Sequence, residues 1–164
     1  MRYIDEVPTS AVRVPSFANL LAPMRYAKQS DEDFDAHADR LPLRKQFYKR
    51  MTQQGFGKEE IDSACDQIRQ TCERIENSLE ELGGPWVLGD QYTLIDAQVT
   101  PSIDRMDDLG YATIWDDLKL MSEWWERIQA RPSYKAAFYF TSRLSEKFPE
   151  YFKTPAELEE ERGY

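Results

Sequence analysis

Apolar side chains repeat along residues 58–82 at alternating steps of four and three. The positions in this stripe are Ile61, Cys65, Ile68, Cys72, Ile75, Leu79 and Leu82. Because these steps return to one side of a helix, the pattern predicts a single helix whose apolar face packs on a partner helix. Two glycines and Pro85 follow, which predicts that the helix ends at Leu82. A long coiled coil has similar spacing, but this stripe is too short for one.

A second helix start stands at Thr93, three residues before Asp96. At this spacing each side chain can bond the backbone N–H of the other, which predicts a capping box with Asp in place of the usual Glu. We therefore interpret Thr93 and Asp96 as a structural N-cap box. The apolar residues that follow are Ile95, Ala97, Val99, Ile103, Met106 and Leu109. They fall on more than one side, which predicts a buried helix that is kinked at Pro101 and ended by Gly110.

Other parts of the chain carry weaker helical patterns. A first helical region is predicted to open at residue 15 or 16 and to break near Pro42. A helix capped by Asp116 or Asp117 is predicted before a short one that Pro132 begins. No run of alternating apolar and polar residues indicates a strand. The sequence therefore predicts an all-α helical bundle.

Composition limits the classes of partner. The 164 residues carry a formal net charge of −9, with 41% hydrophobic and 31% charged residues, which suits one folded domain. An acidic surface repels phosphates and anionic lipid, so neither nucleic acid nor a membrane is expected as a partner. No apolar run approaches the length of a membrane span and no signal peptide opens the chain, so we expect a cytoplasmic protein.

The sequence shows no pattern of catalytic or metal-binding residues. Cys65 and Cys72 lie on one predicted helix about 10 Å apart along its axis, which is too far for a disulfide. His37 is the single histidine, so a His/Cys metal site and a Cys/His or Ser/His nucleophile are both disfavoured. We assign no catalytic residue and no metal site.

A group of carboxylates stands near the end of the second predicted helix. Asp104, Asp107 and Asp108 are interpreted as solvated, and Arg105 is expected to form a surface ion pair with one of them. Such a pair contributes about 0–1 kcal/mol.

Several short motifs together resemble the C-terminal domain of the glutathione transferases. They are Leu88-Gly89-Asp90, Thr93-Leu94, Asp96-Ala97, Pro101, Trp124-Trp125, Ile128 and Ala130-Arg131-Pro132-Ser133. The resemblance extends over about residues 16–138. Residues 24–32 are also similar to the first helix of this domain in bacterial transferases that include the lignin β-etherases.

The resemblance implies a function for the chain. It would be the electrophile-binding half of a glutathione transferase, active in glutathione conjugation or thiol-dependent ether cleavage together with a thioredoxin-like half. That other half would supply the residue that activates glutathione, the co-substrate. Tyr26, Phe34 and His37 would line the pocket for a small hydrophobic electrophile, although plain packing is the alternative for each. A homodimer is also implied.

The resemblance further suggests three segments. Residues 1–15 would be the end of a preceding domain and a linker, residues 16–152 the transferase-like helical domain, and residues 153–164 an acidic C-terminal tail helix. A flexible tail is the alternative for the first segment. Two other readings of the whole chain remain open: a non-catalytic module for protein–protein assembly, and an unrelated acidic helical bundle.

Overall fold

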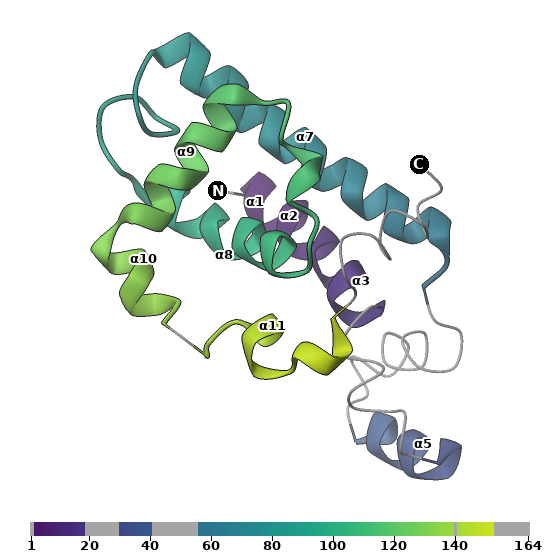
Figure 1. Cartoon of the computed structure of the whole chain (residues 1–164). Helices are drawn as coiled ribbons and strands as arrows, with labels where there is room; N and C mark the ends of the chain where they lie inside the picture. Colours follow the sequence, from purple (N-terminus) through teal and green to yellow (C-terminus); the bar gives the residue numbers. More distant parts are fainter. Residues whose placement is uncertain (1, 19–29, 41–55, 140, 153–164) are drawn as a thin grey trace.

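The computed structural model describes residues 2–18, 30–40, 56–139 and 141–152 (Figure 1). These parts of the chain are helical and hold no strand, only an isolated backbone bridge between Trp86 and Gly89. The helices are α1 (Arg2–Glu6), α2 (Pro8–Ala11), α3 (Arg13–Ser16), α5 (Asp31–Asp39), α7 (Lys58–Leu82), α8 (Leu94–Asp108), η3 (Ala112–Ile114), α9 (Lys119–Ala130), α10 (Pro132–Ala137), α11 (Leu144–Lys147) and η4 (Pro149–Tyr151). The predicted all-α class is confirmed. None of the described helices is both long and apolar enough to span a membrane.

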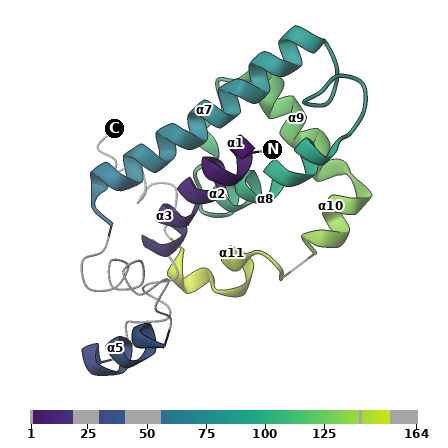
Figure 2. The same cartoon turned by 180° about the vertical axis from the view of Figure 1, so that it is seen from behind.

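Helix α7 is the long element on which the bundle is built. Figure 1 shows α9 crossing one end of it, and Figure 2 shows α1, α2 and α3 in a stepped row beside it. The predicted bounds, Lys58–Leu82, are correct. The residues that this helix buries are Ala64, Ile68, Thr71, Cys72, Ile75 and Leu79. Leu82 was predicted in the stripe but is exposed, because α7 is longer than its partner helices and its last turn extends beyond them.

The N-terminal segment differs from its prediction. Residues 1–15 were expected to contain a linker, yet residues 8–15 form α2 and most of α3, and both helices contact α7. Pro8 and Pro15 are fully buried, and Ile4 and Ala11 belong to the hydrophobic core. Pro8 occupies the first turn of α2, where the N–H that proline lacks is not needed, so it begins a helix rather than preventing one. Helix α3 ends at Ser16 and residues 17 and 18 continue in a π-helical turn; residues 19–29 of the helical region predicted to open at residue 15 or 16 lie outside the described residues.

Helix α8 begins at the predicted box. Thr93 is the N-cap residue, and the carboxylate of Asp96 accepts hydrogen bonds from the Thr93 N–H at 2.8 Å and from its hydroxyl at 2.9 Å. The helix continues through Pro101 to Asp108. Gly110 follows with φ +79°, the left-handed conformation predicted for it. The N–H groups of Gly110 and Tyr111 bond the carbonyls of Asp107 and Met106, which is the pattern of a Schellman motif.

The start of α9 is capped by a different residue from the one predicted. Neither Asp116 nor Asp117 caps it; instead the Glu76 carboxylate of α7 accepts a hydrogen bond of 2.6 Å from the backbone N–H of Met121. Asp117 is turned to Arg69 of α7, which holds it through two guanidinium nitrogens. Helix α7 thus provides Glu76, which caps α9, and Arg69, which binds the aspartate that was expected to cap it. Both contacts are possible because α7 and α9 pack against each other.

Gly84 is required by a close approach of two backbone segments. A Cβ at this position would lie 2.2 Å from the carbonyl carbon of Gly89, inside the tight turn that joins α7 to α8. Backbone cannot rotate away as a side chain can, so Gly84→Ala is expected to lower the free energy of unfolding by roughly 1–3 kcal/mol. Urea unfolding measures the change. Gly57→Ala is the control, since a Cβ there meets nothing within 4 Å; equal losses in both variants would contradict the prediction.

Candidate functional site

The structure does not describe the side chains of the three residues predicted to line a pocket. Tyr26 lies outside the described residues. Phe34 and His37 belong to α5, but their side chains are also outside the description. Their proposed role as pocket residues therefore stays a prediction.

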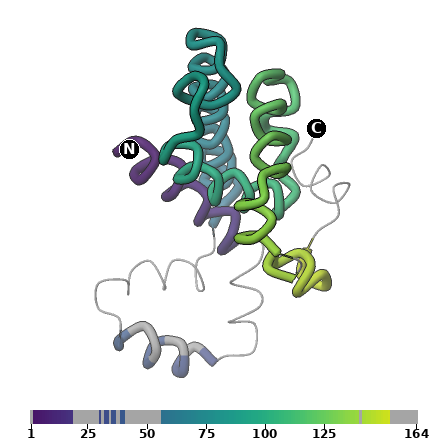
Figure 3. Tube along the Cα trace, turned by 90° about the vertical axis from the view of Figure 1, so that its left-hand side faces the viewer, coloured from purple at the N-terminus to yellow at the C-terminus, as the bar shows by residue number. Residues whose placement is uncertain are grey.

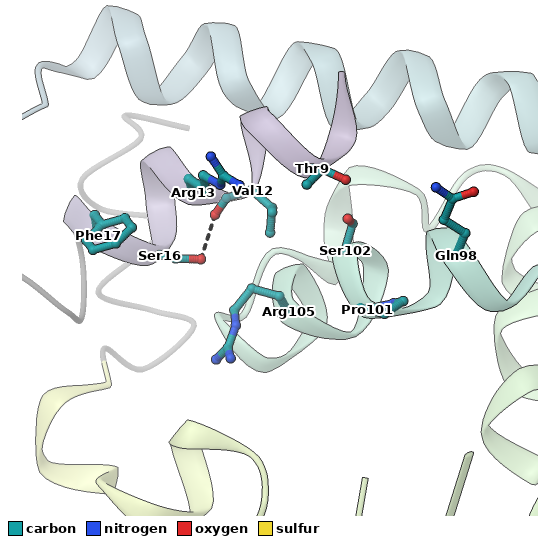
Figure 4. A pocket seen from close by; sticks show the side chains of 9 residues that line it. All are labelled: Thr9, Val12, Arg13, Ser16, Phe17, Gln98, Pro101, Ser102 and Arg105. Carbon is teal, nitrogen blue, oxygen red and sulfur yellow. Dashed lines mark hydrogen bonds between the residues drawn. The ribbon is translucent and has the colours of Figure 1, made fainter. Parts of the chain in front are cut away.

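A pocket of about 460 Å³ lies between the N-terminal helices and α8 (Figure 4). One wall comes from α2, α3 and the residue after them: Thr9, Val12, Arg13, Ser16 and Phe17. Two of its hydroxyls are bonded to backbone within this segment, that of Ser16 to the Val12 carbonyl at 2.5 Å and that of Thr9 to the Ile4 carbonyl at 2.8 Å. The wall is thus a rigid helical surface rather than a loose chain end.

The opposite wall is one face of α8. It consists of Gln98, Pro101, Ser102 and Arg105, at steps of three, one and three residues. This spacing places the four on a single side of the helix. The Nε2 of Gln98 also donates a hydrogen bond of 2.7 Å to the carboxylate of Asp5 in α1. The sequence analysis did not predict this pocket, because it assigned the N-terminal wall to a linker. The polar face of α8, which lies opposite its apolar face, was the feature of the sequence that could have indicated the pocket.

The ionisable residues of the pocket are both arginines. Arg13 stands on the N-terminal wall and Arg105 on the wall of α8, and no carboxylate is among the described lining residues. The chain as a whole carries an excess of acidic residues and a net charge of −9. The charged side chains that line the pocket are therefore positive, and one of them, Arg105, is paired with Asp108 outside the lining.

The carboxylates expected to be solvated are instead mostly buried. Asp104 and Asp108 are buried, and Asp107 is partly buried beside them. Arg143, which precedes α11, bonds Asp107 at 2.6 Å and lies 3.5 Å from Asp104. The hydroxyl of Tyr134 in α10 donates to Asp104 at 2.6 Å. The prediction of solvated groups was wrong because their partners come from a segment about 30 residues further along the chain.

Asp108 joins the pocket wall to this C-terminal segment. Arg105 donates to its carboxylate at 2.9 Å, which is the ion pair expected between Arg105 and one of these carboxylates. The same carboxylate accepts the backbone N–H groups of Leu144 and Ser145 at 3.1 and 3.2 Å, and the Ser145 hydroxyl at 2.5 Å. Figure 3 shows α10 and α11 continuing from the end of α9, apart from α7. These polar bonds therefore help to hold the segment onto α8.

Burial changes the proton affinities in this cluster. It raises the pKa of Asp104, although the Tyr134 hydroxyl and the charge of Arg143 act in the opposite direction. Burial also raises the pKa of Tyr134, and the hydrogen bond to Asp104 adds to that effect. Burial alone would lower the pKa of Arg143, but its bond to Asp107 and the nearby carboxylates raise it overall. The arginine thus stays charged, while Asp104 binds a proton more readily than a free carboxyl.

The raised pKa of Asp104 gives a pH dependence of known sign. Because the folded state binds this proton more tightly than the unfolded state, Asp104 favours folding most below its ordinary pKa of 3.8, and this contribution is lost as the pH rises through the folded pKa. The free energy of unfolding of the wild type, relative to Asp104→Asn, is therefore expected to fall with rising pH across that window. Urea unfolding of both proteins from pH 3 to 7 measures it. A difference that rises with pH would contradict the prediction.

The thiol of Cys72 is not prepared for reaction. Cys72 is buried, and burial raises the pKa of its thiol to about 12, so it is not a thiolate at neutral pH. Among these residues no group of three or more His, Cys, Asp or Glu side chains could hold a metal ion. What this part of the chain offers is a binding pocket and a rigid helical frame.

The fold corresponds to a known class of domain. The family model "Glutathione S-transferase, C-terminal domain" matches residues 32–132, and the chain belongs to the glutathione S-transferase family. The resemblance read from the sequence is thereby confirmed.

Among solved structures, the chain is similar to the crystal structure of the β-etherase LigF from Sphingobium sp. strain SYK-6. The TM-score is 0.68 and the sequence identity 22%, which shows a shared fold. The similarity covers 84% of this chain but 58% of the LigF chain, so this chain spans less than two thirds of that protein. A comparison with curated protein sequences gave no match.

Proposed function

We propose that this chain is the helical, electrophile-binding half of a glutathione-dependent transferase. The observation that carries the proposal is the pocket between α3 and α8, in a chain of the glutathione S-transferase family; its α8 wall lies inside the matched region, residues 32–132. Its size falls in the usual range for small-molecule sites, roughly 300–1,000 Å³. Val12, Phe17 and Pro101 give it an apolar part suited to a hydrophobic electrophile.

In this proposal the chain positions the electrophile and a second domain activates the thiol. A thioredoxin-like domain holds glutathione as its thiolate, which attacks the electrophilic carbon of the bound molecule. A carbon–sulfur bond forms while the bond to the leaving group breaks; in ether cleavage the departing alkoxide takes up a proton. Fixing the electrophile beside the sulfur removes much of the entropic cost of bringing two molecules together. The cytoplasm is the proposed location.

Ether cleavage is the more specific form of the proposal. It is supported by the fold shared with a β-etherase and by residues 24–32, which resemble the first helix of such enzymes. Tyr26, Phe34 and His37 are proposed as further pocket residues.

The native protein tests this function. We would purify it from its own cells, determine its intact mass, and assay it with glutathione and either an aromatic halide or an aryl ether. A mass larger than that of the 164-residue chain by roughly one small domain, together with glutathione-dependent turnover, is the expected result. Ser102→Trp, which fills the pocket, should then reduce turnover, whereas Thr113→Trp on the exposed surface of η3 should not. Absence of turnover in the native protein would reject the proposal.

A second candidate is an assembly module without catalysis. It is favoured by three exposed leucines at the connection between α7 and α8, namely Leu82, Leu88 and Leu94, which are 51–62% exposed. Exposed apolar side chains that gather on one surface commonly mark a contact with another protein.

We expect this protein to form a homodimer, and the leucines give the test. Light scattering after size-exclusion chromatography should report about twice the mass of one chain. Leu94→Glu is expected to shift the protein to monomer when these leucines form the contact. It should not unfold the helix, since a carboxylate in the first turn of α8 is favourable. A monomeric wild type at high concentration would contradict the prediction.

A further inference from the structure

The charge of the pocket points to the chemistry of its ligand. Two arginines stand on its opposite walls. Arg105 is paired with Asp108 at 2.9 Å, whereas Arg13 has no ion-pair partner among the described residues. Arg13 therefore offers the pocket a positive charge that a neutral hydrophobic electrophile would leave unpaired.

Arg105 has hydrogen-bonding capacity left for a ligand. Its Nη1 donates to Asp108, but a guanidinium carries five N–H donors, and no other bond from it is found among the described residues. Asp108 also accepts hydrogen bonds from Leu144 and Ser145, so it does not depend on Arg105 alone for its donors. In Figure 4 the side chain of Arg105 extends from α8 on the side of Ser16, with its guanidinium turned away from Gln98. Its remaining N–H groups can meet an anion without breaking the bond to Asp108.

Arg13 faces the same pocket from α3. It is exposed and has no hydrogen-bond or ion-pair partner in the described parts of the chain. A long, unpartnered arginine can adjust its rotamer to a carboxylate and bond it through two parallel N–H groups. Arg13 and Arg105 can therefore approach one anion from two sides.

The remaining lining residues fit the body of such a ligand. Val12, Phe17 and Pro101 offer apolar surface. The hydroxyl of Ser102, a buried residue without a hydrogen-bond partner among the described residues, points from α8 toward α2 (Figure 4). It can bond a carboxylate oxygen or a second polar group of the ligand.

We propose that this pocket binds carboxylate-bearing apolar molecules, with Arg13 and Arg105 reading the carboxylate and the surface of Val12, Phe17 and Pro101 contacting the apolar body. The inference rests on the proposed function, and it names the class of electrophile: an organic acid rather than a neutral hydrophobic compound. Both arginines are then specificity-determining residues. An uncharged analogue would bind less tightly, because it offers the two guanidinium groups no anion to bond.

The test compares two probes of nearly the same shape, one charged and one neutral. The full chain is titrated with 2-naphthoate and with 2-naphthamide, and binding is followed by calorimetry and by NMR shifts of backbone amides in α3 and α8. Naphthoate is expected to bind at least about tenfold more tightly than the amide, as a charge-assisted hydrogen bond contributes more than a neutral one. Raising the salt concentration should reduce that preference.

Variants assign the preference to the two arginines. Arg13→Met and Arg105→Met keep the length of the stem, and each should weaken naphthoate binding about tenfold while leaving the amide unchanged. Arg13→Met is the cleaner of the two, because it breaks no bond of the fold. The matched control is Arg2→Met, an exposed arginine of α1 that pairs with Glu6 and does not line the pocket. It should bind naphthoate as the wild type does.

Three results would overturn the inference, and they differ in what they say about the proposed function. Equal binding of the two probes would reject the carboxylate preference and keep the pocket. Naphthoate binding that neither arginine variant changes would place the anion elsewhere. No binding of either probe would reject the inference, and the glutathione assay of the native protein would then decide the proposed function on its own.

Discussion

Asp96→Ala should lower the free energy of unfolding by roughly 3–5 kcal/mol, since it leaves several buried donors without an acceptor. Asp96 is fully buried and accepts four hydrogen bonds. Two come from Thr93 at the start of α8. The others come from the backbone N–H of Val87 and from the indole N–H of Trp124 in α9, both at 3.0 Å. The sequence alone, which showed only the helix cap, would have suggested a loss of about 1 kcal/mol.

Two further variants make this prediction specific. Asp96→Asn keeps one acceptor oxygen but turns an NH₂ group toward a donor. Its free energy of unfolding should therefore lie between those of the wild type and Asp96→Ala. Asp90→Ala changes an exposed carboxylate in the preceding turn and should stay within about 0.5 kcal/mol of the wild type. Urea unfolding measures all three. Unchanged stability of Asp96→Ala would show that the carboxylate does not organise this corner of the bundle.

Asp108→Ala is expected to cost roughly 2–4 kcal/mol and to loosen the start of α11, because Arg105, Leu144 and Ser145 lose their shared acceptor. The Asp108 side chain is only 2% exposed, so water cannot easily replace it. Hydrogen exchange resolves the local effect: the amides of Leu144 and Ser145 should exchange faster, while those in the middle of α7 should not.

The control for this variant is Asp116→Ala, which removes an exposed carboxylate in the loop before α9. Its stability and its exchange pattern should match those of the wild type. An Asp108→Ala protein with unchanged protection at residues 144 and 145 would mean that the C-terminal segment is held by its apolar contacts alone.

The features that could be predicted from the sequence are those whose cause is local. The bounds of α7 followed from its apolar period and the glycines after it. The start of α8 followed from the spacing of Thr93 and Asp96, and its end from Gly110. In each case the residues that determine the structure lie within a few positions of one another.

Features that depend on distant partners could not be predicted in this way. Asp104 and Asp108 read as solvated carboxylates until Tyr134, Arg143 and Ser145 are placed beside them. Glu76 caps α9 from 45 residues away, so the nearer aspartates seemed better candidates. The pocket was missed for the same reason: its two walls are separated by about 80 residues of chain, and one of them looked like a linker.

The contact between Asp96 and Trp124 has a practical consequence for measurement. The indole N–H that bonds this carboxylate lies in a side chain with no exposure, and Trp115 and Trp125 are also buried. Buried indoles emit at shorter wavelengths than hydrated ones, and a neighbouring carboxylate perturbs the excited state of the ring it contacts. Intrinsic fluorescence therefore includes a signal from the junction of α8 and α9, beside those of the other three tryptophans, and can follow the unfolding experiments described above.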